Sequence, residues 1–283
     1  MTRKQTVRIA NRSLFYFVLA LALIYTIFPF YWALNGSFQP ETQITATPAD
    51  YLAVPGATAT HYKSVFTNRD FLLSLRNSAI VAGGTTILAL GVGALAACAL
   101  GRYKMRGRQA IMGLVLSMTM FPQISVVGAV KSTISSLGLF NSLGGLILSY
   151  MLFTLPFTIW VMTSFFKSLP RELEESAYVD GASPLQTFWR ILLPLSLPGL
   201  ATTGLLAFIA AWNEYLFALT LTITNESRTV PVVIANFGGD SLFSVPWGSI
   251  MAACVVVTLP LVVLVLIFQR HIVAGMTAGA VKG

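Results

Sequence analysis

The sequence has few charged residues, few cysteines and few histidines. Asp, Glu, Lys and Arg make up only 10% of the 283 residues, whereas a typical soluble protein has about 25%. Hydrophobic residues make up 55%, and the mean hydropathy is positive. A composition this apolar excludes an intrinsically disordered chain and argues against a soluble enzyme.

Residues that could bind a metal or act as a nucleophile are scarce. Cys98 and Cys254 lie in different apolar runs, and their expected depths differ by most of a bilayer, whereas a disulfide needs Cα atoms within about 7 Å. His61 and His271 are expected on opposite sides of the membrane, so they cannot form a metal site together. The GxSxG, HExxH, CxxC and GxxxxGKS/T motifs are absent. We therefore expect no catalytic residue, metal or cofactor in this chain, and another chain must hold any nucleotide that drives it.

The chain does contain six long apolar runs without Lys or Arg. A helix of about 20 apolar residues crosses a hydrocarbon core of about 30 Å. The first run is too long for a signal-peptide core and lacks a small-residue cleavage site, so it should remain a membrane helix. Pro29, Pro122 and Pro156 lie inside runs and predict kinks. We predict an all-α integral membrane protein, a single transmembrane domain over residues 1–283. Its six transmembrane helices are expected at about 14–34, 78–100, 111–130, 143–165, 197–221 and 251–268.

Lys and Arg are unevenly distributed between the segments that connect these runs. Thirteen lie on the side of the two termini, and five lie on the other side. Because cytoplasmic segments carry the excess of Lys and Arg, both termini are predicted to be cytoplasmic. The net charge of +8 is then a topology signal, and we expect no nucleic-acid partner. Residues 35–77 and 222–250 become long external loops, and residues 166–196 become a long cytoplasmic loop.

The cytoplasmic loop has the pattern of two short helices. Pro170 occupies a first helical position, and the acidic residues after it favour the positive end of a helix dipole. Gly181 should end this helix, because the residue after a helix often needs a positive φ. Ser183–Pro184 begins a second helix, which Pro194 and Pro198 end. Composition leaves open an ordinary interfacial helix pair or a docking surface. A docking surface would use small and aromatic side chains, namely Ser176, Ala177, Tyr178, Phe188 and Trp189.

The spacing of residues in this loop resembles a family signature. Glu175-Ser176-Ala177, three residues, Gly181, nine residues and Ile191-x-Leu193-Pro194 resemble the EAA signature of ABC-importer permeases, with Ser176 in place of Ala. The longer stretch from Glu174 to Ala182 is similar to the carbohydrate branch of that family. Asn77-Ser78, Trp212-Asn213-Glu214 and the tail 277–283 are similar to the same branch. The resemblance covers nearly the whole chain and points to the smaller permease subunit of maltose- and trehalose-type importers.

This resemblance implies a transport subunit of the bacterial or archaeal inner membrane, not an enzyme. The subunit would form half of a translocation pore together with a second permease subunit. Two cytoplasmic ATPase subunits would bind ATP and Mg²⁺, and an extracytoplasmic binding protein would deliver the sugar. Because no Lys or Arg lies in a predicted span to hold an anion, we expect a neutral di- or oligosaccharide such as trehalose or maltose.

The resemblance also implies which residues contact the partners. The helix at about Arg171–Val179 would be a coupling helix seated in a cleft of an ATPase subunit. The tip of the third external loop would contact the binding protein, although a plain surface turn fits the sequence equally well. The ATPase-coupling residues would be Glu174, Glu175, Ser176, Ala177, Tyr178, Asp180, Gly181 and Phe188. The binding-protein contacts would be Asn236, Phe237, Gly238 and Gly239.

Glu214 is the only ionisable residue inside a predicted span. Inserting a charged side chain near the centre of a bilayer costs about 2.5–3.5 kcal/mol, so Glu214 should face the pore or a neighbouring helix. With Trp212 and Asn213 it could line the substrate path, or it could clamp two helices together. An ion-coupled secondary carrier using Glu214 is the alternative function, but it leaves the cytoplasmic helix pair without a role. An intramembrane hydrolase is excluded by the missing nucleophile–base and metal sets.

Overall fold

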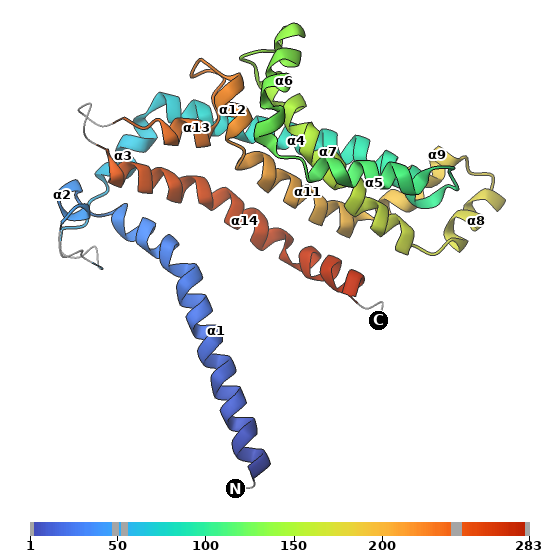
Figure 1. Cartoon of the computed structure of the whole chain (residues 1–283), viewed down its shortest axis with the longest axis horizontal. Helices are drawn as coiled ribbons and strands as arrows, with labels where there is room; N and C mark the ends of the chain where they lie inside the picture. The colour runs from blue at the N-terminus through green and yellow to red at the C-terminus, as the bar shows by residue number, and fades with distance from the viewer. Residues whose placement is uncertain (1–2, 47–50, 52–55, 239–244, 281–283) are drawn as a thin grey trace. The chain divides into compact units, whose positions relative to one another are not determined.

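A computed structural model of the chain describes residues 3–46, 51, 56–238 and 245–280, with side chains described between residues 11 and 270. Every regular element in this described part is helical (Figure 1). The elements are α1 (Arg3–Gly36), α2 (Glu41–Ile44), α3 (Thr60–Thr67), α4 (Arg69–Arg102), α5 (Arg108–Thr119), α6 (Gln123–Ser136), α7 (Leu143–Ser168), α8 (Glu172–Val179), α9 (Pro184–Thr187), the π-helical turn η1 (Phe188–Leu192), α10 (Leu193–Leu195), α11 (Leu197–Trp212), α12 (Leu216–Leu221), α13 (Val230–Ala235) and α14 (Trp247–Ala280).

Among the described residues, four helices are long and apolar enough to cross a membrane. They lie within α1, α4, α7 and α14. Two bent pairs bring the number of candidate spans to six if each pair counts as one. One pair is α5 with α6, bent by 96°, and the other joins the Pro184–Leu195 segment to α11, bent by 76°. The predicted all-α fold with several membrane-spanning helices is confirmed.

Helix breaks occur at two of the predicted spans. At Pro122, where a kink was predicted, the chain leaves α5 and turns into α6. The segment predicted to span as 197–221 contains two helices, because α11 ends at Trp212 and α12 begins at Leu216. By contrast, α1 and α7 continue through Pro29 and Pro156.

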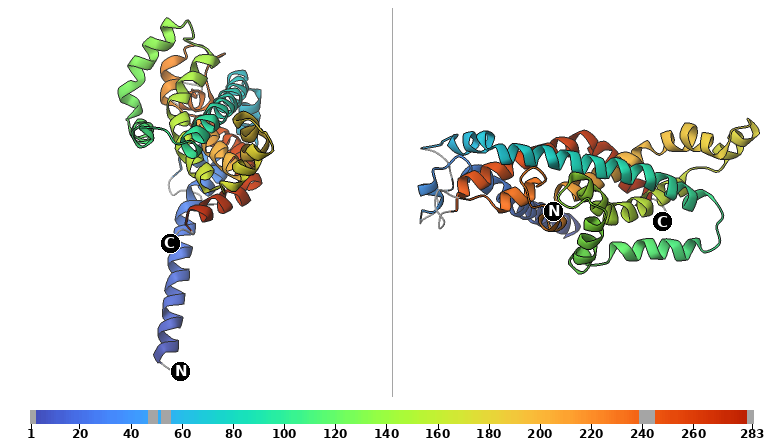
Figure 2. Two further views of the ribbon diagram at one scale, coloured as in Figure 1. Left: turned by 90° about the vertical axis from the view of Figure 1, so that its right-hand side faces the viewer. Right: turned by 90° about the horizontal axis from the view of Figure 1, so that it is seen from above.

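The chain forms two compact units. One comprises residues 1–68 and 236–259, and the other comprises residues 69–235 and 260–283. Within the second unit, α4 packs against both α7 and α11, and α5 packs against α7. The loop predicted to be cytoplasmic, with α8 and α9, extends from one end of this packed group (Figures 1 and 2). This arrangement places the loop at the ends of the helices that it joins.

Candidate functional site

The first helix of the loop predicted to be cytoplasmic, α8, has the start and the end that the sequence indicates. Its first turn holds Glu172, Glu174 and Glu175, whose carboxylates stabilise the positive end of the helix dipole. At the other end Gly181 has φ +80°. The Gly181 N–H donates to the Tyr178 carbonyl at 3.1 Å, and the N–H of the next residue donates to the Ala177 carbonyl at 2.9 Å. These two bonds form a Schellman motif, so the predicted stop at Gly181 is confirmed.

The second helical segment begins with a capping box that the sequence analysis missed. The Ser183 hydroxyl accepts from the Gln186 N–H at 3.3 Å, and the Gln186 side chain accepts from the Ser183 N–H at 2.8 Å. Pro184 stands at the first helical position. The Ser-x-x-Gln spacing was a signal available in the sequence. The capping box fixes the direction in which the chain enters α9 and η1.

Three of the eight predicted coupling residues are buried inside the chain. Ala177 is buried, and Phe188 packs in a core cluster with Cys98, Met162 and Phe166. Glu174 is also buried. The other five are exposed, namely Glu175, Ser176, Tyr178, Asp180 and Gly181. The three buried residues therefore anchor the loop, and the five exposed residues remain accessible to a partner.

Large apolar side chains are exposed on this otherwise polar loop. Val179 is 88% exposed and Trp189 is 54% exposed, and Leu185 and Tyr178 are also exposed. The sequence analysis named the aromatic residues but missed Val179 and Leu185. Bulky apolar residues in a charged loop were the available signal, because exposed apolar groups often mark interaction sites.

The Tyr178 hydroxyl also has a neighbour at the end of α4. Burial and a hydrogen bond with Tyr178 raise the pKa of Tyr103 to about 12.

Arg102, at the end of α4, was counted in the sequence analysis only as a topology charge. Its Nε donates to Glu174 Oε2 at 2.9 Å, and its Nη2 lies 2.6 Å from the same oxygen. The two side chains are 3% and 12% exposed. Glu174 therefore pairs within the chain, whereas the adjacent Glu175 is exposed. No local spacing indicates this pair, because the two residues are 72 positions apart.

The predicted substrate-path residues lie where α11 ends. Trp212 is buried and stacks on Phe208, with ring centroids 5.6 Å apart. Asn213 is exposed, and its side-chain amide donates to the Ile209 carbonyl at 2.9 Å.

Both carboxylate oxygens of Glu214 bind the start of α12. Oε1 accepts from the Phe217 N–H at 2.8 Å, and Oε2 accepts from the Ala218 N–H at 3.1 Å. A carboxylate engaged in this way caps a helix. This geometry gives Glu214 a local structural role and leaves Asn213 as the exposed member of the three.

The segment before α13, which is predicted to be external, is fixed to α4 and to the start of α7. Asn77 Nδ2 donates to the carbonyls of Glu226 and Arg228 at 2.8 and 3.0 Å, and the Ser78 hydroxyl accepts from the Val230 N–H. Asn141, just before α7, accepts through Oδ1 from the N–H groups of Ile223 and Thr224. The Asn77-Ser78 pair thus acts as an anchor for this loop.

The predicted binding-protein contacts follow α13. Asn236 and Gly238 are exposed and Phe237 is half-buried. Gly239 lies outside the described residues. The tail 277–283 lies partly outside them too, and its backbone is helical up to Ala280.

Comparison with known proteins gives matches over most of the chain. A family model described as "Binding-protein-dependent transport system inner membrane component" matches residues 89–278. The trehalose transport system permease protein SugB of Mycobacterium tuberculosis is 42% identical over 97% of this chain and 99% of that protein. The trehalose/maltose transport system permease protein MalG of Thermococcus litoralis is 43% identical over 93% of this chain and 94% of that protein.

A solved structure shares the fold. A chain in the crystal structure of a bacterial ABC transporter involved in the import of alginate, an acidic polysaccharide, superposes with a TM-score of 0.80. The match covers 95% of this chain and 98% of that chain at 21% sequence identity.

Proposed function

Since this chain belongs to the family of inner membrane components of binding-protein-dependent transport systems, we propose that it is a permease subunit of an ATP-driven sugar importer. As a member of this family it is a membrane transport component and not an enzyme. It would form half of the translocation pore in a bacterial or archaeal inner membrane, with both termini in the cytoplasm. The observation that carries the proposal is the identity above 40% over nearly the whole chain to two sugar permeases.

Docking of an ATPase subunit through residues 166–196 is the first part of the proposal. The loop is anchored by its buried residues, and it exposes Tyr178, Val179, Leu185 and Trp189. Burying such side chains against a partner is favourable at about 25 cal/mol per Å². Exposed Glu175 and Asp180 would set the orientation of the partner. The partner subunits would hold ATP and Mg²⁺.

The substrate we propose is a neutral di- or oligosaccharide. The two relatives are named for transport of trehalose and of trehalose or maltose. No Lys or Arg lies within the predicted spans to hold an anionic sugar. Of the three residues first assigned to the substrate path, Asn213 is the one whose exposed position suits contact with sugar hydroxyls.

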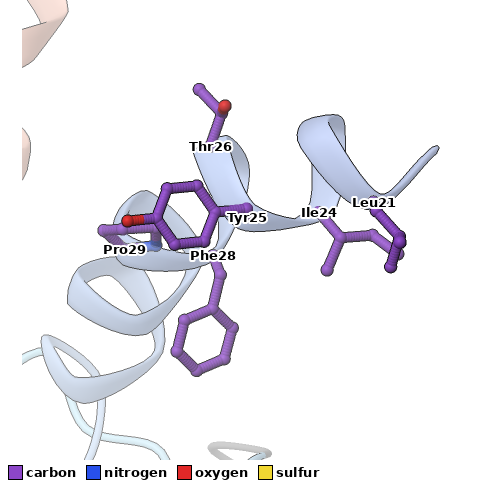
Figure 3. A pocket seen from close by; sticks show the side chains of 6 residues that line it. All are labelled: Leu21, Ile24, Tyr25, Thr26, Phe28 and Pro29. Carbon is purple, nitrogen blue, oxygen red and sulfur yellow. The ribbon is translucent and has the colours of Figure 1, made fainter. Parts of the chain in front are cut away.

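A second permease subunit and an extracytoplasmic binding protein complete the proposed assembly. No residue in the most apolar part of α1 is buried within the described part of the chain. One face of this helix is hollowed beside Pro29 and lined by Leu21, Ile24, Tyr25, Thr26 and Phe28 (Figure 3). Such a surface suits lipid and the helices of a second permease subunit. On the outer side, the segment fixed by Asn77 and Asn141 would support contact with the binding protein.

The proposal is tested by transport with the purified assembly. The chain is isolated with its partner subunits and inserted into lipid vesicles, and uptake of labelled trehalose or maltose is measured with the binding protein outside. We expect uptake to require ATP inside the vesicles and to resist ionophores that abolish ion gradients. A non-hydrolysable ATP analogue is the matched control. Uptake driven by an ion gradient without ATP would contradict the proposal and favour the carrier alternative.

A further inference from the structure

The guanidinium group of Arg102 uses all of its hydrogen-bonding capacity at one junction. An arginine has five N–H donors in a planar fork. Nε and Nη2 bind the Glu174 carboxylate. Nη1 donates to the carbonyls of Phe166 and Leu169 at 3.0 and 2.7 Å, and Nη2 also donates to the Pro170 carbonyl at 3.0 Å. We call this set of contacts the Arg102 junction.

The junction joins three helices. Arg102 is the last residue of α4, the three carbonyls lie at the end of α7 or just beyond it, and Glu174 lies in the first turn of α8. The last carbonyls of a helix have no partner within that helix, and a cation at this end is favourable. Arg102 therefore caps α7 and pairs with α8 at the same time.

The burial of this pair makes it costly to open. Removing one partner of a buried ion pair leaves an uncompensated charge, which is strongly destabilising. Lysine would keep the charge, but it has three donors on a compact ammonium group and cannot reproduce the planar fork. The geometry therefore requires arginine specifically.

The second half of the loop is attached to the same helices by apolar packing. Phe188 and Leu192 lie in one cluster with Ala97 of α4 and Met162 of α7. Gly101 allows α4 to lie close to α7, since an added Cβ would be only 3.1 Å from the Cβ of Phe166. The loop is thus held to α4 and α7 at two separate points, one polar and one apolar.

From this geometry the structure assigns Arg102 a role as the positioning residue that makes α8, α4 and α7 move as one rigid body. This inference rests on the proposed function, because it concerns how α8 acts once an ATPase subunit is seated on it. A displacement of α8 would pass directly through the Arg102 junction to two membrane-spanning helices. An element that transmits a displacement between two sites has to be stiff, and specific contacts have to hold it to its neighbours.

The inference is tested by measuring sugar imported per ATP hydrolysed. The complete importer in vesicles carries Arg102→Lys or Glu174→Gln, and Arg106→Gln serves as control because Arg106 is exposed and lies outside the junction. We expect the two junction variants to bind the ATPase subunits normally and to import less sugar per ATP by about 2- to 30-fold, the range for residues in coupling networks. Arg106→Gln should keep the unmodified ratio. Unchanged ratios in both junction variants would overturn the inference.

A distance measurement covers the case in which a junction variant fails to assemble. Spin labels are placed at Glu172 and Leu95, which are exposed on α8 and α4, in the otherwise unmodified assembly. A rigid junction predicts the same label distance without nucleotide and with ATP bound. A change of distance on ATP binding would show that α8 moves independently and would overturn the inference. If the unmodified importer transports without hydrolysing ATP, the proposed function itself fails; if it is coupled and the junction variants are equally coupled, only the role of Arg102 fails.

Discussion

Gly181 and Arg102 both stabilise the conformation of the loop at residues 166–196, but only the role of Gly181 could be predicted from the sequence. Gly181 could be predicted because the positive φ after a helix is a local backbone requirement. The pairing of Arg102 with Glu174 could not, because burial decides which of several basic residues binds which acid. The same holds for Glu214, whose bonds to the Phe217 and Ala218 N–H groups became visible only when α11 was seen to end at Trp212.

Replacing Gly181 tests the need for a left-handed residue at this point. We expect Gly181→Val to strain the loop, because a β-branched residue at positive φ is a clear outlier and such strain costs about 1–3 kcal/mol. ATP hydrolysis should then continue with reduced sugar uptake, or the ATPase subunit should dissociate. The measurement is the ratio of uptake to hydrolysis in vesicles, together with the amount of ATPase subunit that co-purifies.

Gly181→Asn is the matched control for this change. Asparagine tolerates the left-handed region better than other non-glycine residues, and no atom lies within 4 Å of where its Cβ would be. This variant should be close to the unmodified protein. If valine and asparagine have equal effects, backbone strain at Gly181 is not the cause.

Two prolines inside predicted spans have different effects on their helices. Proline at position 122 separates α5 from α6, whereas α7 continues through Pro156. A proline removes one helix hydrogen bond in either case, so the surroundings decide whether the helix continues. Pro156 is buried in α7, which packs against α4. None of the residues of α5 is buried, so α5 has less packing that would oppose a break at Pro122.

The exposed side chains of the loop lead to a prediction about docking of the ATPase subunit. Trp189→Ala should weaken binding of the ATPase subunit by about 2 kcal/mol or more, since buried tryptophans are frequent hot spots of interfaces. Titration of the ATPase subunit against the membrane assembly measures this affinity. Trp160→Ala is a matched control, because Trp160 is 44% exposed and lies on the membrane helix α7. Equal losses of affinity in the two variants would contradict docking through Trp189.

At the scale of the whole molecule, composition and charge pattern set the class and the expected orientation. The low content of charged residues and the six apolar runs were sufficient for the membrane fold, and the family match over residues 89–278 agrees with it. Orientation in the membrane stays a prediction from the uneven distribution of Lys and Arg. The proposal of a neutral sugar draws on the names of two relatives and on the absence of Lys and Arg from the predicted spans.

Orientation can be measured with single cysteines. Cys98 and Cys254 are replaced by alanine, and a cysteine is introduced at Met105 or at Ile223, both exposed. In intact cells a thiol reagent that cannot cross the membrane should label position 223 and not position 105. The same reagent should label both positions after the membrane is made permeable. Labelling of position 105 alone in intact cells would reverse the proposed topology.

The sequence by itself determined the helical membrane class, the two helices of the loop at residues 166–196, the end of α8 at Gly181 and the family resemblance. These follow from hydrophobic run length, backbone conformation and the spacing of nearby residues, which are all local properties. Only the tertiary structure decided that Glu174, Ala177 and Phe188 face inward, that Glu214 caps α12 and that Arg102 joins α4, α7 and α8. Burial and ion pairing depend on which distant segments meet, and the free energy of those contacts is set by packing that no local pattern specifies.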